Sequence, residues 1–146
     1  MDDMELKTRS IEDYYNESLN ALTFDEVTLQ AFQQQVGVKI ARWSKYLYDE
    51  ERVLEYGKNV YSCVYKKVWH NLMFGEKSEI ADYKVDKKNL NIYIDADKSI
   101  KEAKTAVHDQ EEKCKFIQNV IDALKNQSFI LNNYVKHLIW KSGGEV

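Results

Sequence analysis

The segment IKEAKTAVHDQEEKCKFIQNVIDAL, residues 100–124, repeats mostly apolar side chains at the a and d positions of a seven-residue pattern. These positions are held, in order, by Ile100, Ala103, Val107, Gln110, Cys114, Ile117, Ile121 and Leu124. Such a repeat is typical of a long amphipathic helix that buries one face against other helices. We expect this helix to be capped by Asp95-Ala96-Asp97 and to break at Asn126-Gln127-Ser128, before a last helical segment.

A second long helical pattern precedes it. Apolar residues recur at spacings of three and four over residues 29–72, and Gly75 is expected to end the helix. Glu50 and Gly57 interrupt the apolar seam, so a bend or hairpin near residues 48–52 is possible. The chain has no proline and only five glycines among its 146 residues, so little interrupts long helices. The expected fold class is mainly α.

Two shorter elements are expected. Ser10 precedes acidic residues and is predicted to cap a short helix that ends near Leu22. Over residues 89–95, leucine and isoleucine alternate with other side chains, and this period of two predicts a short extended or β segment. A semi-ordered linker fits the same residues equally well.

The apolar stripes are too wide to be buried inside one thin helical protomer. We therefore expect the chain to form a homo-oligomer. The candidate residues for this contact are Ile117, Ile121, Leu124, Phe129, Val135 and Leu138.

The charge is distributed unevenly. The formal net charge is −3, which argues against coating of duplex DNA by bulk electrostatics, yet the first 26 residues hold eight acids and two bases, so the rest is net basic. No apolar run approaches the roughly 20 residues of a membrane span, and the N-terminus lacks the pattern of a secretory signal. We expect an intracellular protein without a membrane segment, in which Cys63 and Cys114 are reduced and buried.

The positive charge gathers in stretches that lack carboxylates. Residues 56–75 hold Lys58, Lys66 and Lys67 together with Trp69 and other large aromatic side chains. Lysines neutralise phosphates and aromatic rings stack on unpaired bases, so the stretch predicts contact with single-stranded nucleic acid. Some of these aromatic side chains also belong to the apolar seam of the helix, so a role in the core fits them as well.

Two further stretches add to this pattern. Residues 27–48 hold Lys39, Arg42 and Lys45, and residues 123–144 hold four more basic or histidine side chains. Repeated around an oligomer, such patches would sum to a continuous positive track, which suits a flexible single strand. We divide the single domain into an acidic arm (1–9), an N-terminal helical DNA-binding part (10–75), a connector (76–95) and oligomerisation helices (96–146).

Signals of catalysis are missing from the sequence. His70, His108 and His137 share no metal-ligand spacing with each other or with a cysteine, and no glycine-rich phosphate loop is present. Asp95 and Asp97 are explained as a helix cap. A protein without enzymatic activity, cofactor or metal is expected.

Six short segments cover nearly the whole chain from residue 11: Ile11-Glu12-Asp13, Ala41-Arg42-Trp43-Ser44-Lys45-Tyr46-Leu47, Tyr65-Lys66-Lys67-Val68, Ala96-Asp97-Lys98, Asp122-Ala123-Leu124-Lys125 and Val135-Lys136-His137. In their sequence and their order along the chain, these segments resemble the UvsY family of recombination mediators from T-even-like bacteriophages. The resemblance implies a helical protein that forms rings of about six or seven copies through C-terminal helices. It also implies binding of single-stranded DNA, loosening of the phage single-strand-binding protein, and loading of a RecA-like recombinase in the host cytoplasm.

The basic motif of the family falls at Lys66 and Lys67. The family pattern there is a Lys-x-Arg pair, whereas this chain has adjacent lysines. Two other readings remain open on the residues alone: a helical structural or adaptor protein of a phage that binds only protein, and a duplex-binding architectural protein.

Overall fold

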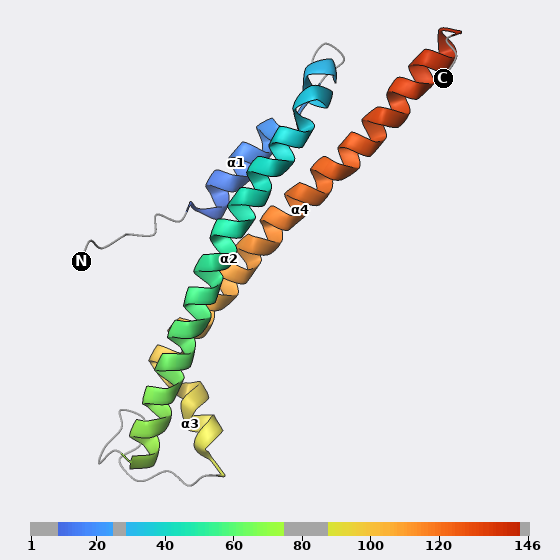
Figure 1. Cartoon of the computed structure of the whole chain (residues 1–146). Coiled ribbons are helices and arrows are strands. Elements are labelled where there is room, and N and C mark those ends of the chain that lie inside the picture. Colours follow the sequence, from blue (N-terminus) through green and yellow to red (C-terminus); the bar gives the residue numbers. More distant parts are fainter. Residues whose placement is uncertain (1–8, 25–28, 75–87, 144–146) are drawn as a thin grey trace, which may run out of the picture. The chain divides into compact units, whose positions relative to one another are not determined.

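The computed structural model describes residues 9–24, 29–74 and 88–143. Within these residues the chain forms α1 (Ile11–Leu22), α2 (Leu29–Phe74), α3 (Leu90–Ala96) and α4 (Lys98–Lys141), and no strand (Figure 1). The mainly α fold class is confirmed.

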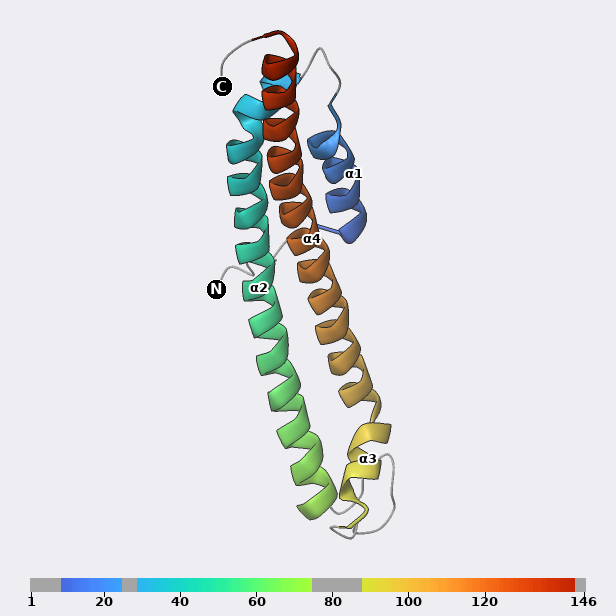
Figure 2. The same cartoon turned by 90° about the vertical axis from the view of Figure 1, so that its right-hand side faces the viewer.

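The helices form two compact units that do not follow chain order. Unit 1 comprises residues 1–50 and 113–146, and unit 2 comprises residues 51–112. The two long helices, α2 and α4, each contribute to both units, whereas α1 belongs to unit 1 and α3 to unit 2 (Figure 2).

The short helix α1 is fixed at both ends by side chains. Ser10 and Asp13 form a reciprocal capping box at its start, as predicted. At its end, the Lys39 ammonium donates to the Ala21 carbonyl at 3.1 Å, and the Gln127 amide donates to the Leu22 carbonyl at 3.0 Å. Both carbonyls belong to the last turn of α1, where carbonyl groups have no hydrogen-bond donor within the helix.

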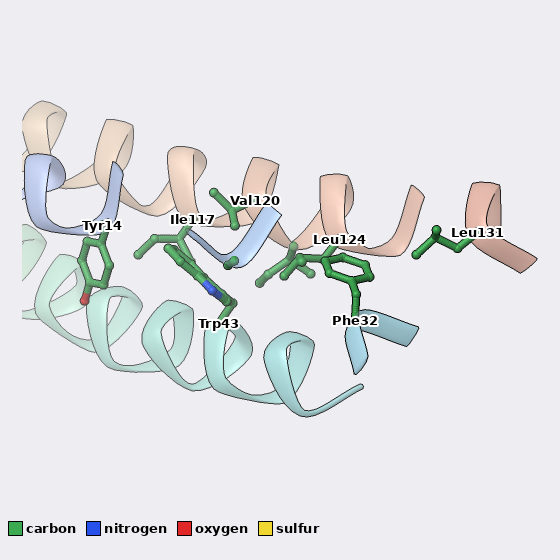
Figure 3. Packing of buried hydrophobic residues seen from close by; sticks show 9 residues of the cluster. Tyr14, Phe32, Trp43, Ile117, Val120, Leu124 and Leu131 are labelled. Atoms are coloured by element: carbon green, nitrogen blue, oxygen red, sulfur yellow. The ribbon is translucent and has the colours of Figure 1, made fainter. Parts of the chain in front are cut away.

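The core of unit 1 is built from α1, α2 and α4. Tyr14 packs against Trp43, with ring centroids 6.0 Å apart, and Trp43 is almost fully buried. Ile117 and Leu124 of α4 are completely buried in the same cluster (Figure 3). The apolar stripe read from residues 117–124 is therefore covered within one protomer.

The acidic residue that interrupts the apolar seam of α2 is buried and has partners. Glu50 is only 3 % exposed, accepts a hydrogen bond from the Tyr14 hydroxyl at 2.9 Å, and lies 3.7 Å from the Lys113 ammonium. Since a buried carboxylate is costly without partners, these groups let the helix continue where the pattern suggested a bend. α2 runs through residues 48–52 without a break.

Unit 2 has a separate core where α3 meets α2 and α4. It comprises Val68, Leu72, Met73, Leu90, Ile94 and Ile100. Asp97 caps α4 by accepting hydrogen bonds from the backbone amides of Ser99 and Ile100 at 2.9 and 3.2 Å. The predicted capping role of Asp97 is confirmed.

The extended segment predicted for residues 89–95 is wrong, because these residues form α3. Leu90 and Ile94 fit a period of two, but they also lie four residues apart and so share one helical face. Both are buried, whereas Ile92, which an alternating strand would place beside them, is 68 % exposed. Burial on α2 and α4 therefore selects the helix.

The break predicted at Asn126-Gln127-Ser128 is also wrong, since α4 is continuous from Lys98 to Lys141. Asparagine, glutamine and serine cost less than about 0.7 kcal/mol each in a helix, and burial of Leu124 and Leu131 on either side outweighs that. The predicted helix end at Gly75, and the connector over residues 76–87, lie outside the described residues.

Candidate nucleic-acid interface

The basic strip of α2 carries half-buried tyrosines and exposed lysines. Tyr61 and Tyr65 are half-buried against the core of unit 2, with ring centroids 6.2 Å apart. Lys58, Lys66 and Lys67 are exposed on the same helix. From helical geometry Lys58 lies about 20° from Tyr65, so this lysine and the tyrosines share one flank of the helix.

Two of the lysines share one sector of α2 with Trp69. From helical geometry, Lys58, Lys66 and Trp69 lie within about 80° of one another, whereas Lys67 lies about 100° from Lys66. Lys58 and Lys66 are about 12 Å apart along the axis. Trp69 is 38 % exposed and meets the edge of Phe74 at 5.9 Å, which holds the indole in place. The sector can neutralise phosphates and offer a ring to a base.

The predicted cations of residues 27–48 are less available. Lys39 caps α1 and lies 4.5 Å from the centre of the Phe32 ring, and its burial lowers the pKa of its ammonium group. Lys45 is paired with Asp49 one turn away. Arg42 is exposed. The lysines of unit 2 are therefore the stronger candidates for phosphate contact.

A row of basic side chains on α4 was not predicted from the sequence. Lys101, Lys104 and His108 lie at spacings of three and four, so they share one flank of the helix in unit 2. Glu102 and Asp109 lie between or beside them in the sequence, so a search for acid-free stretches passes over the row. The spacing of three and four residues was the signal in the sequence that could have predicted this row.

The predicted oligomerisation residues differ in exposure. Ile117, Ile121 and Leu124 lie in the core of unit 1. Beyond them Phe129 is 65 % and Leu138 is 42 % exposed, whereas Val135 is half-buried and Leu131 still belongs to the core of unit 1. The large apolar side chains that stay exposed near the end of α4, here called the exposed apolar segment, lie on several sides of the helix: Phe129, Ile130, Tyr134, Leu138, Ile139 and Trp140.

Residues typical of metal sites are scattered. Across the described part of the chain, no group of three or more histidine, cysteine or acidic side chains could hold a metal ion. Cys114 is buried as expected, but Cys63 is exposed, so the expectation of burial was wrong for that residue.

None of the helices within the described ranges has a stretch that is long and apolar enough to cross a bilayer.

Comparison with protein families gives a match over most of the chain. The family described as "Recombination, repair and ssDNA binding protein UvsY" matches residues 13–144, which is nearly the whole chain. No curated protein and no solved structure matches. The matched range takes in both units and the cation-bearing faces of α2 and α4.

Proposed function

The chain belongs to the UvsY family of recombination, repair and single-stranded-DNA-binding proteins, and from that premise we propose that it is a phage recombination mediator. In this role it binds single-stranded DNA in the host cytoplasm, weakens the hold of the phage single-strand-binding protein, and loads and stabilises a RecA-like recombinase filament. The family match over residues 13–144 carries the proposal.

The proposed contact with DNA lies on α2 in unit 2. Lys58 and Lys66 are exposed and share one sector of the helix with Trp69, which lies three residues beyond Lys66. Lys67 points to a neighbouring sector and extends the positive surface around the helix. Arg42 is a weaker candidate, because it stands alone once Lys39 and Lys45 are engaged within the fold.

The proposed assembly uses the exposed apolar segment of α4. A monomeric protein rarely leaves so many large apolar side chains in water, and Trp140 is 71 % exposed. A contact between this segment and a different surface of the next copy gives a ring where the rotation between copies closes. A ring of about six or seven copies would present the α2 lysines many times along one strand, so weak contacts would add up.

The proposed mechanism follows from that multiplicity. A strand drawn along a ring through many salt-sensitive phosphate contacts is held in a curved path. A single-strand-binding protein that needs a different path loses affinity, and the organised strand becomes the starting point for the recombinase. No step needs bond chemistry, in keeping with a non-catalytic role.

The test is fluorescence anisotropy with a labelled oligonucleotide across a salt series. The double variant Lys66→Ala/Lys67→Ala should bind every sequence more weakly. The slope of log K against log salt should fall in magnitude by about 1.4 per protomer engaged, since each phosphate contact on a single strand contributes about 0.7. The control Lys88→Ala/Lys115→Ala removes the same charge from exposed positions elsewhere and should keep the slope.

Three results would count against the proposal. An unchanged slope in Lys66→Ala/Lys67→Ala would exclude both lysines as phosphate ligands. Equal affinity for duplex DNA would favour an architectural protein. Absence of any binding by the wild type would favour an adaptor that binds only protein.

A further inference from the structure

A depression on the surface of unit 2 lies between an aromatic ring of α2 and the row of basic side chains on α4. Its volume is about 300 Å³, and it is lined by Tyr61, Lys104, Val107, His108 and Glu111. A second hollow of about 430 Å³ is lined by Lys101, Lys104, Thr105 and His108. Lys104 and His108 line both hollows, so the two form one continuous surface.

The two lysines of this surface form no ion pair with its one carboxylate, Glu111. Among the described residues, neither Lys101 nor Lys104 has an acidic side chain within ion-pair distance, whereas the neighbouring Lys98 lies 3.8 Å from Glu102. Cations three and four residues apart on a helix repel each other. An anion bound between Lys101 and Lys104 would turn this repulsion into attraction, which points to an anionic ligand.

The uncharged part of the surface suits a flat, apolar group. Tyr61 packs against the core of unit 2 and lies beside Tyr65, and it also lines the depression together with Val107. A fixed aromatic ring beside an aliphatic side chain is a platform on which a base can stack. Glu111 closes one end and would repel a phosphate there, so the phosphates belong at the Lys101 end.

We infer that this surface, defined by Tyr61, Lys101, Lys104 and His108, is a nucleotide-binding subsite for single-stranded DNA. It would seat one base on Tyr61 and Val107 and the adjoining phosphate on Lys101 and Lys104, with His108 donating a hydrogen bond. The inference rests on the proposed function and adds a subsite apart from the Lys66 and Lys67 positions. An acidic peptide would satisfy the cations but would leave the aromatic platform unused, so a nucleotide is the better fit.

The first test is the variant Lys101→Ala/Lys104→Ala in the anisotropy salt series. Both lysines are exposed, so the far-ultraviolet circular dichroism spectrum should be unchanged. We expect the salt slope to fall in magnitude by about 1.4 per protomer engaged, relative to the Lys88→Ala/Lys115→Ala control. A slope equal to that of the control would overturn the inference.

The second test locates the base directly. An oligonucleotide carrying 5-iodouracil is cross-linked by light to the wild-type protein, and the modified peptide is identified by mass spectrometry. We expect a cross-link at Tyr61, and a protein cross-linked only at other residues would overturn the assignment of the base to this ring. Both tests use the full-length chain.

The outcomes separate this inference from the proposed function. If the wild type binds no single-stranded DNA, the proposed function itself fails. If it binds and only Lys66→Ala/Lys67→Ala lowers the slope, the subsite alone is refuted. If Lys101→Ala/Lys104→Ala keeps its affinity for DNA but loses binding to a polyglutamate probe, the surface serves an acidic protein and the inference is overturned.

Discussion

Removing the Tyr14 hydroxyl tests how the core of unit 1 tolerates its buried charge. In the variant Tyr14→Phe the ring stays against Trp43, but Glu50 loses a hydrogen bond of 2.9 Å. The carboxylate is 3 % exposed, so water replaces little of that bond, and Lys113 at 3.7 Å compensates only in part. A hydrogen bond to a charged group contributes about 1.5–3 kcal/mol, and we expect the free energy of unfolding to fall by that amount.

The assay is urea unfolding followed by circular dichroism, with Tyr15→Phe as the matched control. Tyr15 follows directly in α1 but is exposed, so its change should stay within about 0.5 kcal/mol. Equal midpoints for the two variants would refute the role assigned to the Tyr14 hydroxyl.

The pH dependence gives an independent check on the same bond. Burial, and then the bond to Glu50, raise the pKa of Tyr14 above its ordinary value of 10.0. A raised folded-state pKa gives stability that is complete below that ordinary value and is lost as the pH rises above it. The advantage of the wild type over Tyr14→Phe should therefore hold near neutral pH and shrink above about pH 10. An advantage that grows with pH would contradict this reasoning.

Three further changes test the fold and the assembly. Leu124→Ala, at a fully buried position, should lower the free energy of unfolding by about 2–5 kcal/mol in urea titrations. Gly37→Ala should raise the melting temperature, because the new methyl group meets nothing within 4 Å and alanine is favoured over glycine in a helix by about 0.5–1 kcal/mol. Leu138→Glu, in the exposed apolar segment of α4, should reduce the mass measured by light scattering without loss of helix signal. An unchanged mass would show that Leu138 does not contribute to the contact between copies.

The long helices could be predicted because their apolar spacing is local information. The type of α3 could not be decided in the same way, because Leu90 and Ile94 satisfy a strand and a helix alike. Only packing against α2 and α4, which depends on residues far away in the chain, makes the helix the better solution. The continuity of α2 at Glu50 likewise depends on Tyr14 and Lys113, which lie far from Glu50 in the sequence.

The roles of single cations were harder to predict than the existence of basic faces. Lys39 looked like a phosphate ligand, but it caps α1 through a carbonyl 18 residues earlier in the chain. The row at Lys101 and Lys104 was hidden because acids interrupt it in sequence but not on the helix surface. Whether a lysine is free depends on the tertiary contacts of its ammonium group, and sequence alone does not carry those contacts.

The apolar stripe of α4 poses a related problem. Its period shows that one face is buried, but not whether the cover comes from the same chain or from another copy. At Ile117 and Leu124 the cover is α1 and α2 of the same protomer. Only from Phe129 onward does the structure leave apolar side chains for a second chain.

We propose that weak cationic contacts hold single-stranded DNA firmly only when several copies act together. The most direct test is sedimentation of the wild type and of Leu138→Glu with a labelled oligonucleotide, which reports mass and binding in one experiment. The wild type should sediment as a closed oligomer with its DNA, and the dissociated variant should bind about 10²–10⁴-fold more weakly. A single protomer that holds the oligonucleotide as tightly as the assembly does would contradict the account.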